Sequence, residues 1–264
     1  MIVRQQPDDS LIFITQNDHA KLSGIFAAHW GNDRFARLHP YESTVRAAVF
    51  HDCGWYRYDT KPRYDVATRM SPTFFQVPLD EEQLAAFQWG IDWLGETDPY
   101  AGLLIGRHRT GLWRNRYDTL THPALRGGGH LSAEVEDFLA RNEPSQREAI
   151  EAFGRREFEI NFHLLQVWDL LSLYVCTSEP KPDHIEPVPS SYDNASAAVR
   201  MTLTPLDSGR VVIDPYPFDV APLPVSYIYR HLPTRIYPDV ASFRIAYFGA
   251  PLQLRTFAFV PPTA

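Results

Sequence analysis

The sequence predicts an α+β protein, with a mainly helical body and N-terminal β-hairpin over residues 1–180 and a C-terminal antiparallel β region over residues 181–264. Three observations support this prediction. The first 15 residues contain two short β-favouring runs on either side of a turn. The middle of the chain carries apolar residues at the three- and four-residue spacing of amphipathic helices. Beyond residue 180 the chain is proline-rich and then continues in short alternating runs typical of strands.

Composition and charge indicate a globular protein with an ordinary core. The 264 residues are 44% hydrophobic and carry a formal net charge of −7, which gives no support for binding to nucleic acid or to an anionic membrane. No apolar run approaches the roughly 20 residues of a spanning helix, and the first ten residues do not resemble a signal peptide. Cys53 and Cys176 both lie in apolar helical contexts. We therefore expect reduced cysteines in a cytoplasmic protein.

The N-terminal hairpin is expected to pair residues 2–4 with residues 11–14 across a Pro-Asp-Asp-Ser turn. Asn17 or Asp18 can then cap a helix with an apolar stripe. His19 lies in the first turn of that stripe, so its ring is expected to point inward. Taken alone, His19 is explained equally well as a core histidine bonded to a backbone carbonyl.

The stretch 45–55 is predicted to be an apolar helix end with an adjacent His51-Asp52 pair, followed by Gly54, which ends the helix. Adjacent side chains on a helix point about 100° apart, so these two converge only on a point beside the helix end. A metal ion is the commonest occupant that needs an imidazole and a carboxylate so placed. The alternative is a buried histidine beside a surface aspartate.

Residues 56–79 have few periodic positions and several prolines, which predicts a long ordered loop. Lys61 and Arg63 in this loop are candidates for binding an anionic substrate. The alternative for each is solvated surface charge.

Two further helices are predicted, one capped by Asp80 and one opened by Asp98-Pro99. The second carries His108 on its buried face, with Arg107 and Arg109 about 100° to either side and nearer the rim. His108 is therefore a candidate catalytic residue, and the two arginines are candidates for binding phosphate. The alternative is a basic helix end favoured by the helix dipole.

The last helical region is expected over residues 132–142 and then, from a capping-box pattern at Ser145, in one long helix to about Cys176. The late part of that helix is almost wholly apolar except at His163 and Asp169. A carboxylate in such a run is costly to bury unless it is paired or bound to a cation.

The C-terminal region is expected to pair with the N-terminal hairpin, because a lone two-stranded hairpin is marginal in water. Its strands are predicted at residues 198–203, 210–213, 225–229, 243–247 and 252–260.

In their order along the chain, His19, the adjacent His51-Asp52 pair and Asp169 resemble the HD-domain superfamily of metal-dependent phosphohydrolases. The sequence His51-Asp52-Cys53-Gly54 also resembles the His-Asp-x-Gly form common in that superfamily. Residues 16–20, 51–55 and 98–108 further resemble a bacterial family of uncharacterised proteins that is usually grouped with HD domains. The resemblance implies an HD-like helical body with a metal held by His19, His51, Asp52 and Asp169.

Two histidines and two carboxylates suit a divalent Mn, Fe, Co, Ni or Zn ion with open positions for water and substrate. The resemblance thus implies a hydrolase of a small anionic molecule, namely a phosphomonoester, phosphodiester or nucleotide. Metal-activated water would attack phosphorus, with Asp52 and His108 in the catalytic roles. One ion is expected, and a second would need another histidine from among His122, His130 and His163.

Two other functions stay open. Some HD-fold proteins use paired irons to activate oxygen, so a di-iron oxygenase is one alternative, and a metal-binding module without turnover is another. Mononuclear nucleotidases often carry a glutamate shortly after the His-Asp pair, whereas this chain has Cys53-Gly54-Trp55-Tyr56. The general base is therefore unassigned, and the sequence leaves the substrate and the oligomeric state open.

Overall fold

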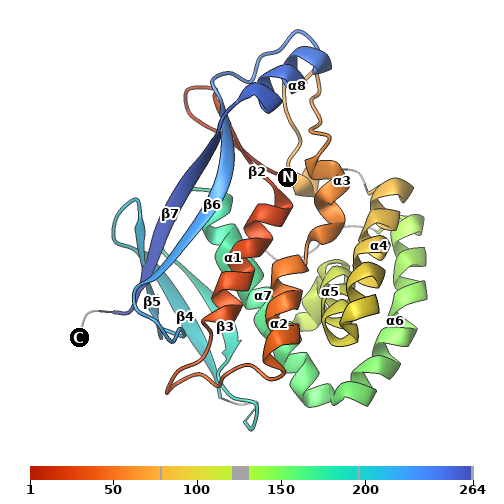
Figure 1. The fold of residues 1–264 in the computed structure, drawn as a ribbon, viewed down its shortest axis with the longest axis vertical. Helices are drawn as coiled ribbons and strands as arrows, with labels where there is room; N and C mark the ends of the chain where they lie inside the picture. Colours follow the sequence, from red (N-terminus) through yellow and green to blue (C-terminus); the bar gives the residue numbers. More distant parts are fainter. Residues whose placement is uncertain (78, 121–130, 195–196, 263–264) are drawn as a thin grey trace.

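One seven-stranded sheet contains strands from both ends of the chain (Figure 1). The computed structural model describes residues 1–77, 79–120, 131–194 and 197–262. The strand order is β1-β2-β6-β7-β5-β4-β3, and neighbouring strands are antiparallel except β5 and β7, which run parallel. The strands are β1 Ile2–Gln5, β2 Leu11–Ile14, β3 Asp183–Pro189, β4 Ala198–Pro205, β5 Arg210–Asp214, β6 Leu223–Leu232 and β7 Leu252–Val260.

The N-terminal hairpin pairs with the C-terminal strands, as predicted. Strand β2 lies antiparallel to β6, with Leu11 opposite Leu232 and Phe13 opposite Arg230. The hairpin therefore has a partner strand that covers one of its edges. The regions on the two sides of residue 180 share this one sheet.

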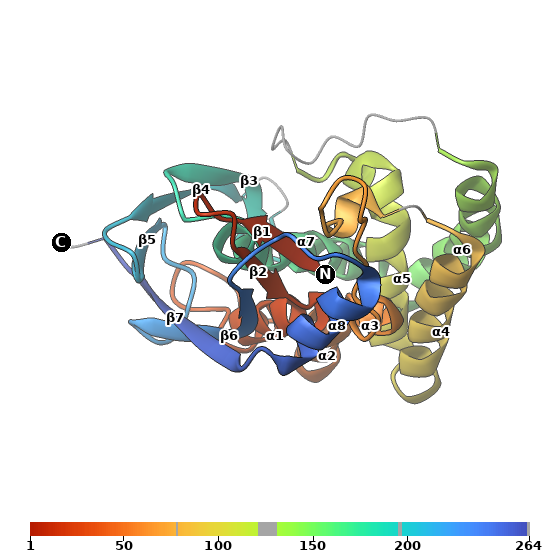
Figure 2. The same ribbon diagram turned by 90° about the horizontal axis from the view of Figure 1, so that it is seen from above.

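The helices extend from the sheet in successive layers (Figures 1 and 2). Helices α1 and α7 pack next to the sheet, α2 and α5 lie beyond them, and α4 and α6 form the outer side. None of the helices within the described ranges is long and apolar enough to cross a bilayer. Their bounds are α1 Gln16–Ala28, α2 Tyr41–Phe50, α3 Tyr56–Asp59, α4 Glu81–Thr97, α5 Pro99–Trp113, α6 Ala133–Phe153, α7 Arg155–Cys176 and α8 Val240–Gly249.

Side chains cap three of these helices close to where the sequence predicts. Asp80 and Asp98 cap α4 and α5, each accepting a hydrogen bond from a backbone N–H of the first turn. The cap of α1 is Thr15 rather than Asn17 or Asp18, because the Thr15 hydroxyl accepts a hydrogen bond from the backbone N–H of Asp18 at 2.9 Å. His19 still falls in the first turns of the helix and points inward.

The prediction of one long helix from Ser145 to Cys176 is wrong at the N-terminal end of that helix. Helix α6 runs through Ser145 to Phe153 and ends at Gly154, whose φ is +94°. A side chain would be strained at that backbone angle, so glycine, and not the capping-box pattern, sets the boundary between α6 and α7.

Residues 243–247, predicted as a strand, lie instead in α8. The Asp239 side chain caps this helix by accepting from the backbone N–H of Ser242. Phe243 and Tyr247, four residues apart, are buried, whereas Ile245 is 75% exposed. This is helical periodicity, which a short run of alternating apolar residues does not distinguish from a strand.

Strand β3 was not predicted, because Pro187 and Pro189 lie within it. It forms the outer edge of the sheet beyond β4. Proline cannot donate a ladder hydrogen bond, and an edge strand tolerates this loss.

Candidate metal centre

Three histidines and two aspartates from four different helices meet in the helical body. His19 lies on α1, His51 and Asp52 follow α2 directly, His108 lies on α5 and Asp169 on α7. Each is at most 5% exposed. His19, His51 and Asp169 form one group that could hold a metal ion, and His51, Asp52 and His108 form another, the ligand atoms of each group lying within 4.8 Å of one another. The structure therefore brings together the four predicted metal ligands and the predicted catalytic histidine.

His51 lies at the centre of this cluster. Its Nε2 is 3.5 Å from Asp169 Oδ1 and 3.9 Å from Asp52 Oδ2. Its ring centroid is 5.1 Å from that of His19 and 5.0 Å from that of His108. Both carboxylates therefore lie within 4 Å of one imidazole nitrogen, a separation that a single ion can bridge.

The tautomer of His51 is fixed by the end of α2. Its Nδ1–H donates to the Ala48 carbonyl at 2.8 Å, and a carbonyl can only accept. In the neutral ring, Nε2 therefore carries a lone pair directed at the carboxylates of Asp52 and Asp169. Within the described ranges of the chain, this buried nitrogen has no hydrogen-bond partner. A lone pair facing two carboxylates is favourable only when a cation or a proton lies between them.

The same arrangement recurs at His19. The Ser172 hydroxyl donates to the Asp169 carbonyl at 2.7 Å, so its oxygen accepts from His19 Nδ1–H, also at 2.7 Å. The His19 Nε2 lone pair then faces Asp52 Oδ2 at 3.0 Å. Metal-binding histidines are typically oriented in this way, with the second ring nitrogen donating to an acceptor beyond the ligands.

The two aspartates remain ionised despite their burial. Burial raises the pKa of Asp52, but the contact with His19 and the charges of His51 and Arg109 together outweigh this and hold the pKa well below the usual range. Burial likewise opposes ionisation of Asp169, and the nearby imidazole of His51 together with the charge of Arg116 keeps the pKa of Asp169 far below its ordinary value. Two ionised carboxylates in the core favour a bound cation.

The pKa values of the two neighbouring histidines, His51 and His108, shift in opposite directions. Burial lowers the pKa of His51, but the carboxylates of Asp169 and Asp52 outweigh it and raise that pKa. Burial lowers the pKa of His108 well below its ordinary value, so its ring is neutral. Its Nε2 lies 3.9 Å from Asp169 Oδ2, and no described residue forms a hydrogen bond with its Nδ1. His108 is thus available as a neutral ligand or proton acceptor.

Arg109 belongs to the cluster, but it does not lie at the rim as predicted. It is 6% exposed, and its Nη2 donates to Asp52 Oδ1 at 2.6 Å. Its guanidinium lies 3.9 Å from the centroid of the Phe87 ring and within 6.0 Å of the Trp55 and Trp113 rings. The aromatic contacts hold this cation in place, and Arg109 orients Asp52.

Arg116 is a member of the cluster that sequence reasoning missed. It lies in the short turn Asn115–Asp118 after α5, and its Nη2 donates to Asp169 Oδ2 at 3.1 Å. The requirement that a buried carboxylate be paired was a signal that a cation must lie near Asp169. Nothing in the local sequence identified Arg116 as that cation.

The other predicted substrate-binding residues lie elsewhere. Arg107 pairs with Glu159 at 3.3 Å, and its guanidinium stacks 3.5 Å from the centroid of the Tyr117 ring. Lys61 and Arg63 line a separate hollow of about 140 Å³, which shares no lining residue with the cluster. The structure gives these three residues no contact with the predicted ligands.

Of the three histidines proposed to complete a second ion site, the structure describes His163, which lies outside the cluster. The His163 imidazole faces the backbone of Pro187, and burial lowers its pKa to about 4. His122 and His130 lie outside the described residues. Among the described histidines, His108 is therefore the third member of the cluster.

The cluster is nearly closed to solvent. A cavity of about 10 Å³ adjoins it, lined by residues that include His51, Cys53, Phe87 and Arg109. This volume is close to that needed by a single water molecule. An ion or a water fits there, whereas a larger substrate requires the surrounding side chains to move.

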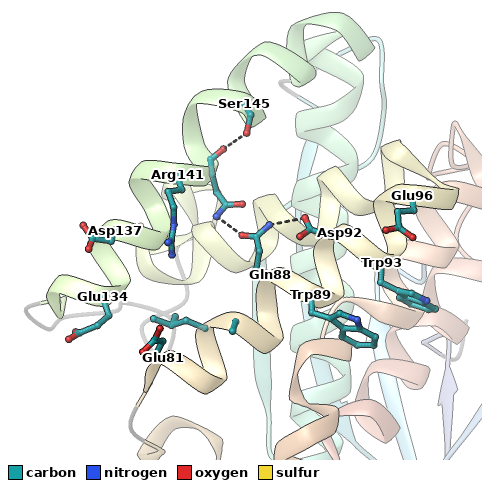
Figure 3. Close-up of a pocket in the computed structure, with 13 residues that line it drawn as sticks. Glu81, Gln88, Trp89, Asp92, Trp93, Glu96, Glu134, Asp137, Arg141 and Ser145 are labelled. Atoms are coloured by element: carbon teal, nitrogen blue, oxygen red, sulfur yellow. Dashed lines mark hydrogen bonds between the residues drawn. The ribbon is translucent and has the colours of Figure 1, made fainter.

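A much larger groove of about 1020 Å³ lies between α4 and α6, away from the cluster (Figure 3). Trp89 and Trp93 stack along its α4 side with ring centroids 5.9 Å apart. Its charged lining residues are mostly acidic: Glu81, Asp92, Glu96, Glu134 and Asp137 against Arg141. Such a lining disfavours an anion, so the buried cluster and not this groove is the candidate site.

Comparison with curated proteins and with solved structures finds no match. A family model described as "Protein of unknown function (DUF3891)" matches residues 1–234. This chain therefore belongs to the DUF3891 family.

Proposed function

We propose that this protein is a metal-dependent hydrolase of a small phosphorylated molecule. The supporting observation is that the two histidines whose tautomers are fixed by the protein, His19 and His51, direct Nε2 lone pairs at the Asp52 and Asp169 carboxylates. These four residues would hold one Mn, Fe, Co, Ni or Zn ion. When bound, such an ion lowers the pKa of a water ligand and polarises a phosphoryl oxygen.

The remaining polar groups of the cluster support the same chemistry. Arg109 and Gln16 both donate to Asp52, at 2.6 and 3.1 Å, and fix the direction of its oxygens. His108 is neutral and has an unpartnered Nδ1, so it can accept a proton from an attacking water or bind a second ion. These residues would orient the attacking water and the phosphoryl group.

A di-iron oxygenase is the second candidate. The observation in its favour is that the cluster contains His108 in addition to the four ligands proposed for one ion, so it offers a further ligand for a second. Iron-dependent oxygen uptake by protein loaded with ferrous iron would favour this function. Hydrolysis of phosphate esters without oxygen uptake would favour the first.

The deciding experiment begins with the metal content of protein purified without chelator or a metal-affinity tag. We expect about one equivalent of a transition metal in the wild type. Asp169→Asn and His51→Gln should each lower this content at least about tenfold. The matched control is His163→Gln, which removes a buried histidine from the helix that carries Asp169 and should retain the wild-type content.

The metal-loaded protein is then assayed against a panel of phosphomonoesters, phosphodiesters and nucleotides. Turnover that is lost with Asp169→Asn and retained with His163→Gln would support the proposal. A wild type that binds metal but turns over no member of the panel would indicate a metal-binding module instead.

A further inference from the structure

The turn that carries Arg116 has a strained backbone. Asn115, Arg116, Tyr117 and Asp118 are consecutive non-glycine residues with φ of 52°, 54°, 51° and 58°. In this left-handed conformation each Cβ approaches the following carbonyl oxygen, so runs of such residues are costly and rare. Backbone strain of this kind persists only where surrounding contacts hold it, and it concentrates at functional sites.

Contacts on both sides of Arg116 hold the turn. The Asn115 side-chain amide donates to Asp118 Oδ1 at 2.9 Å. The Tyr117 hydroxyl bonds to Thr110 Oγ1 at 2.8 Å on α5 and to Glu143 Oε1 at 3.0 Å on α6. These contacts fix the turn to two helices and direct the intervening Arg116 side chain inward.

Arg116 reaches the cluster with one of its two terminal guanidinium nitrogens, Nη2. Its side chain is 6% exposed, and Nη2 donates to Asp169 Oδ2 at 3.1 Å. Nη1 is buried, and it has no hydrogen-bond partner among the residues that the structure describes. A buried guanidinium nitrogen without an acceptor is unfavourable, and its natural acceptors are the oxygens of a carboxylate or a phosphate.

Arg116 differs in this respect from Arg109. Arg109 extends from the regular helix α5 and is held among the aromatic rings of Trp55, Phe87 and Trp113. Arg116 has no such aromatic stacking among the described cation–aromatic contacts, and its ion pair with Asp169 is longer, at 3.1 Å against 2.6 Å for Arg109 with Asp52. Arg116 is thus the cation that is less firmly held.

We propose that Arg116 is the anion-binding residue of this centre and that it alternates between two partners. Without metal it neutralises Asp169. When a divalent cation binds Asp169, the guanidinium is released, and both terminal nitrogens become available to a tetrahedral oxyanion such as the phosphoryl group of a substrate. The proposal rests on the metal-dependent function above and adds the residue that recognises the phosphoryl group.

Titration calorimetry with Mn²⁺, followed by inorganic phosphate, tests the two halves of the proposal separately. Arg116→Gln removes a cation that competes for Asp169, so it should bind Mn²⁺ at least about fivefold more tightly than the wild type. The Mn²⁺-loaded variant should bind phosphate at least about tenfold more weakly, because the two guanidinium donors are lost.

Arg4→Gln is the matched control. Arg4 is also a buried arginine that pairs with a carboxylate, Glu179, and its Nη1 also lacks a partner among the described residues, but it lies on β1 and its carboxylate partner is not a member of the cluster. This variant should keep both wild-type affinities. If Arg116→Gln does not fold, Arg116→Lys keeps the charge without the planar fork and should lose phosphate affinity while retaining Mn²⁺ affinity.

The outcomes distinguish this inference from the proposed function. A wild type that binds no divalent metal overturns both. A wild type that binds Mn²⁺, together with an Arg116 variant whose two affinities match those of Arg4→Gln, overturns the role of Arg116 alone.

Discussion

Gly24 on α1 lies so close to Val49 on α2 that a Cβ at position 24 would come within 2.3 Å of Val49 Cγ2. This close approach lies between the two helices that supply His19 and His51, whose ring centroids are 5.1 Å apart. Glycine at position 24 therefore sets the spacing of α1 and α2, and with it the distance between two candidate ligands.

We expect Gly24→Ala to separate the two helices. A β-branched side chain on a helix has one strongly preferred rotamer, so Val49 cannot turn away, and the clash should cost about 1 to 3 kcal/mol of unfolding free energy. Adding Val49→Ala should recover part of this loss, because the obstructing methyl group is removed. Urea unfolding of the four proteins of this double-mutant cycle measures the coupling, and strictly additive effects would contradict the packing explanation.

Ser172 is expected to control metal affinity without binding metal itself. Ser172→Ala removes the acceptor that fixes His19 Nδ1–H, so the ring is free to adopt the other tautomer or to rotate. Metal affinity should fall about tenfold, as calorimetry would show. Ser71→Ala is the control, because Ser71 is a buried serine whose hydroxyl donates to the Arg63 carbonyl, away from the cluster. Equal affinities for the two variants would show that Ser172 does not position His19.

The inward placement of two candidate ligands could be predicted because each of them interrupts an apolar helical face. Asp169 in the apolar run of α7 and His19 on the stripe of α1 are polar residues at core positions, and helical periodicity alone directs them inward. That reasoning directs the two side chains inward, whereas their grouping with His51 and Asp52 into one site was predicted from the resemblance to HD domains.

The parts of the site and the fold that could not be predicted depend on contacts between segments distant in sequence. The inward direction of Arg116 depends on a left-handed turn that Thr110 and Glu143 hold through Tyr117. The same limit applies to the predicted strand 243–247, where an apolar pattern fits both periods, and the cap at Asp239 accompanies a helix instead. Local sequence does not encode these tertiary partners.

His163 is expected to make the protein less stable in mild acid. Its pKa is lowered to about 4 in the folded protein by burial, against an ordinary value of 6.5. As the pH falls from 7 towards 4, the unfolded chain takes up a proton that the folded protein refuses, so the free energy of unfolding decreases. His163→Gln should remove about 2 to 3 kcal/mol of this decrease.

Urea unfolding of the wild type and His163→Gln at several pH values between 4 and 7 checks this prediction. Carboxylates that titrate in the same range are common to both proteins, so the difference between the two curves isolates His163. His39→Gln is the control, since the His39 side chain is 78% exposed. If the free energy of unfolding depends on pH in the same way in the wild type and in His163→Gln, the buried imidazole is not the source of the loss of stability in acid.

Glu179 is predicted to fasten the end of the helical body to the sheet. Its carboxylate binds the guanidinium of Arg255 on β7 through both oxygens, at 2.7 and 2.5 Å, and also pairs with Arg4 on β1. The hydrogen bond from Arg255, together with that from Arg4, lowers the pKa of Glu179 to about 2, against an ordinary 4.5. The stabilisation from this ion pair is therefore complete above pH 4.5 and is lost as the pH falls towards 2.

Glu179→Gln should thus lower the free energy of unfolding at pH 7 by about 1 kcal/mol, a modest value because solvent screens a side chain that is 54% exposed. The difference from the wild type should shrink below pH 4.5 and vanish near pH 2, where the wild-type carboxyl is itself protonated. Raising the salt concentration at pH 7 should also reduce it. A deficit that stays constant from pH 7 to pH 2 would show that Glu179 acts through packing rather than through its charge.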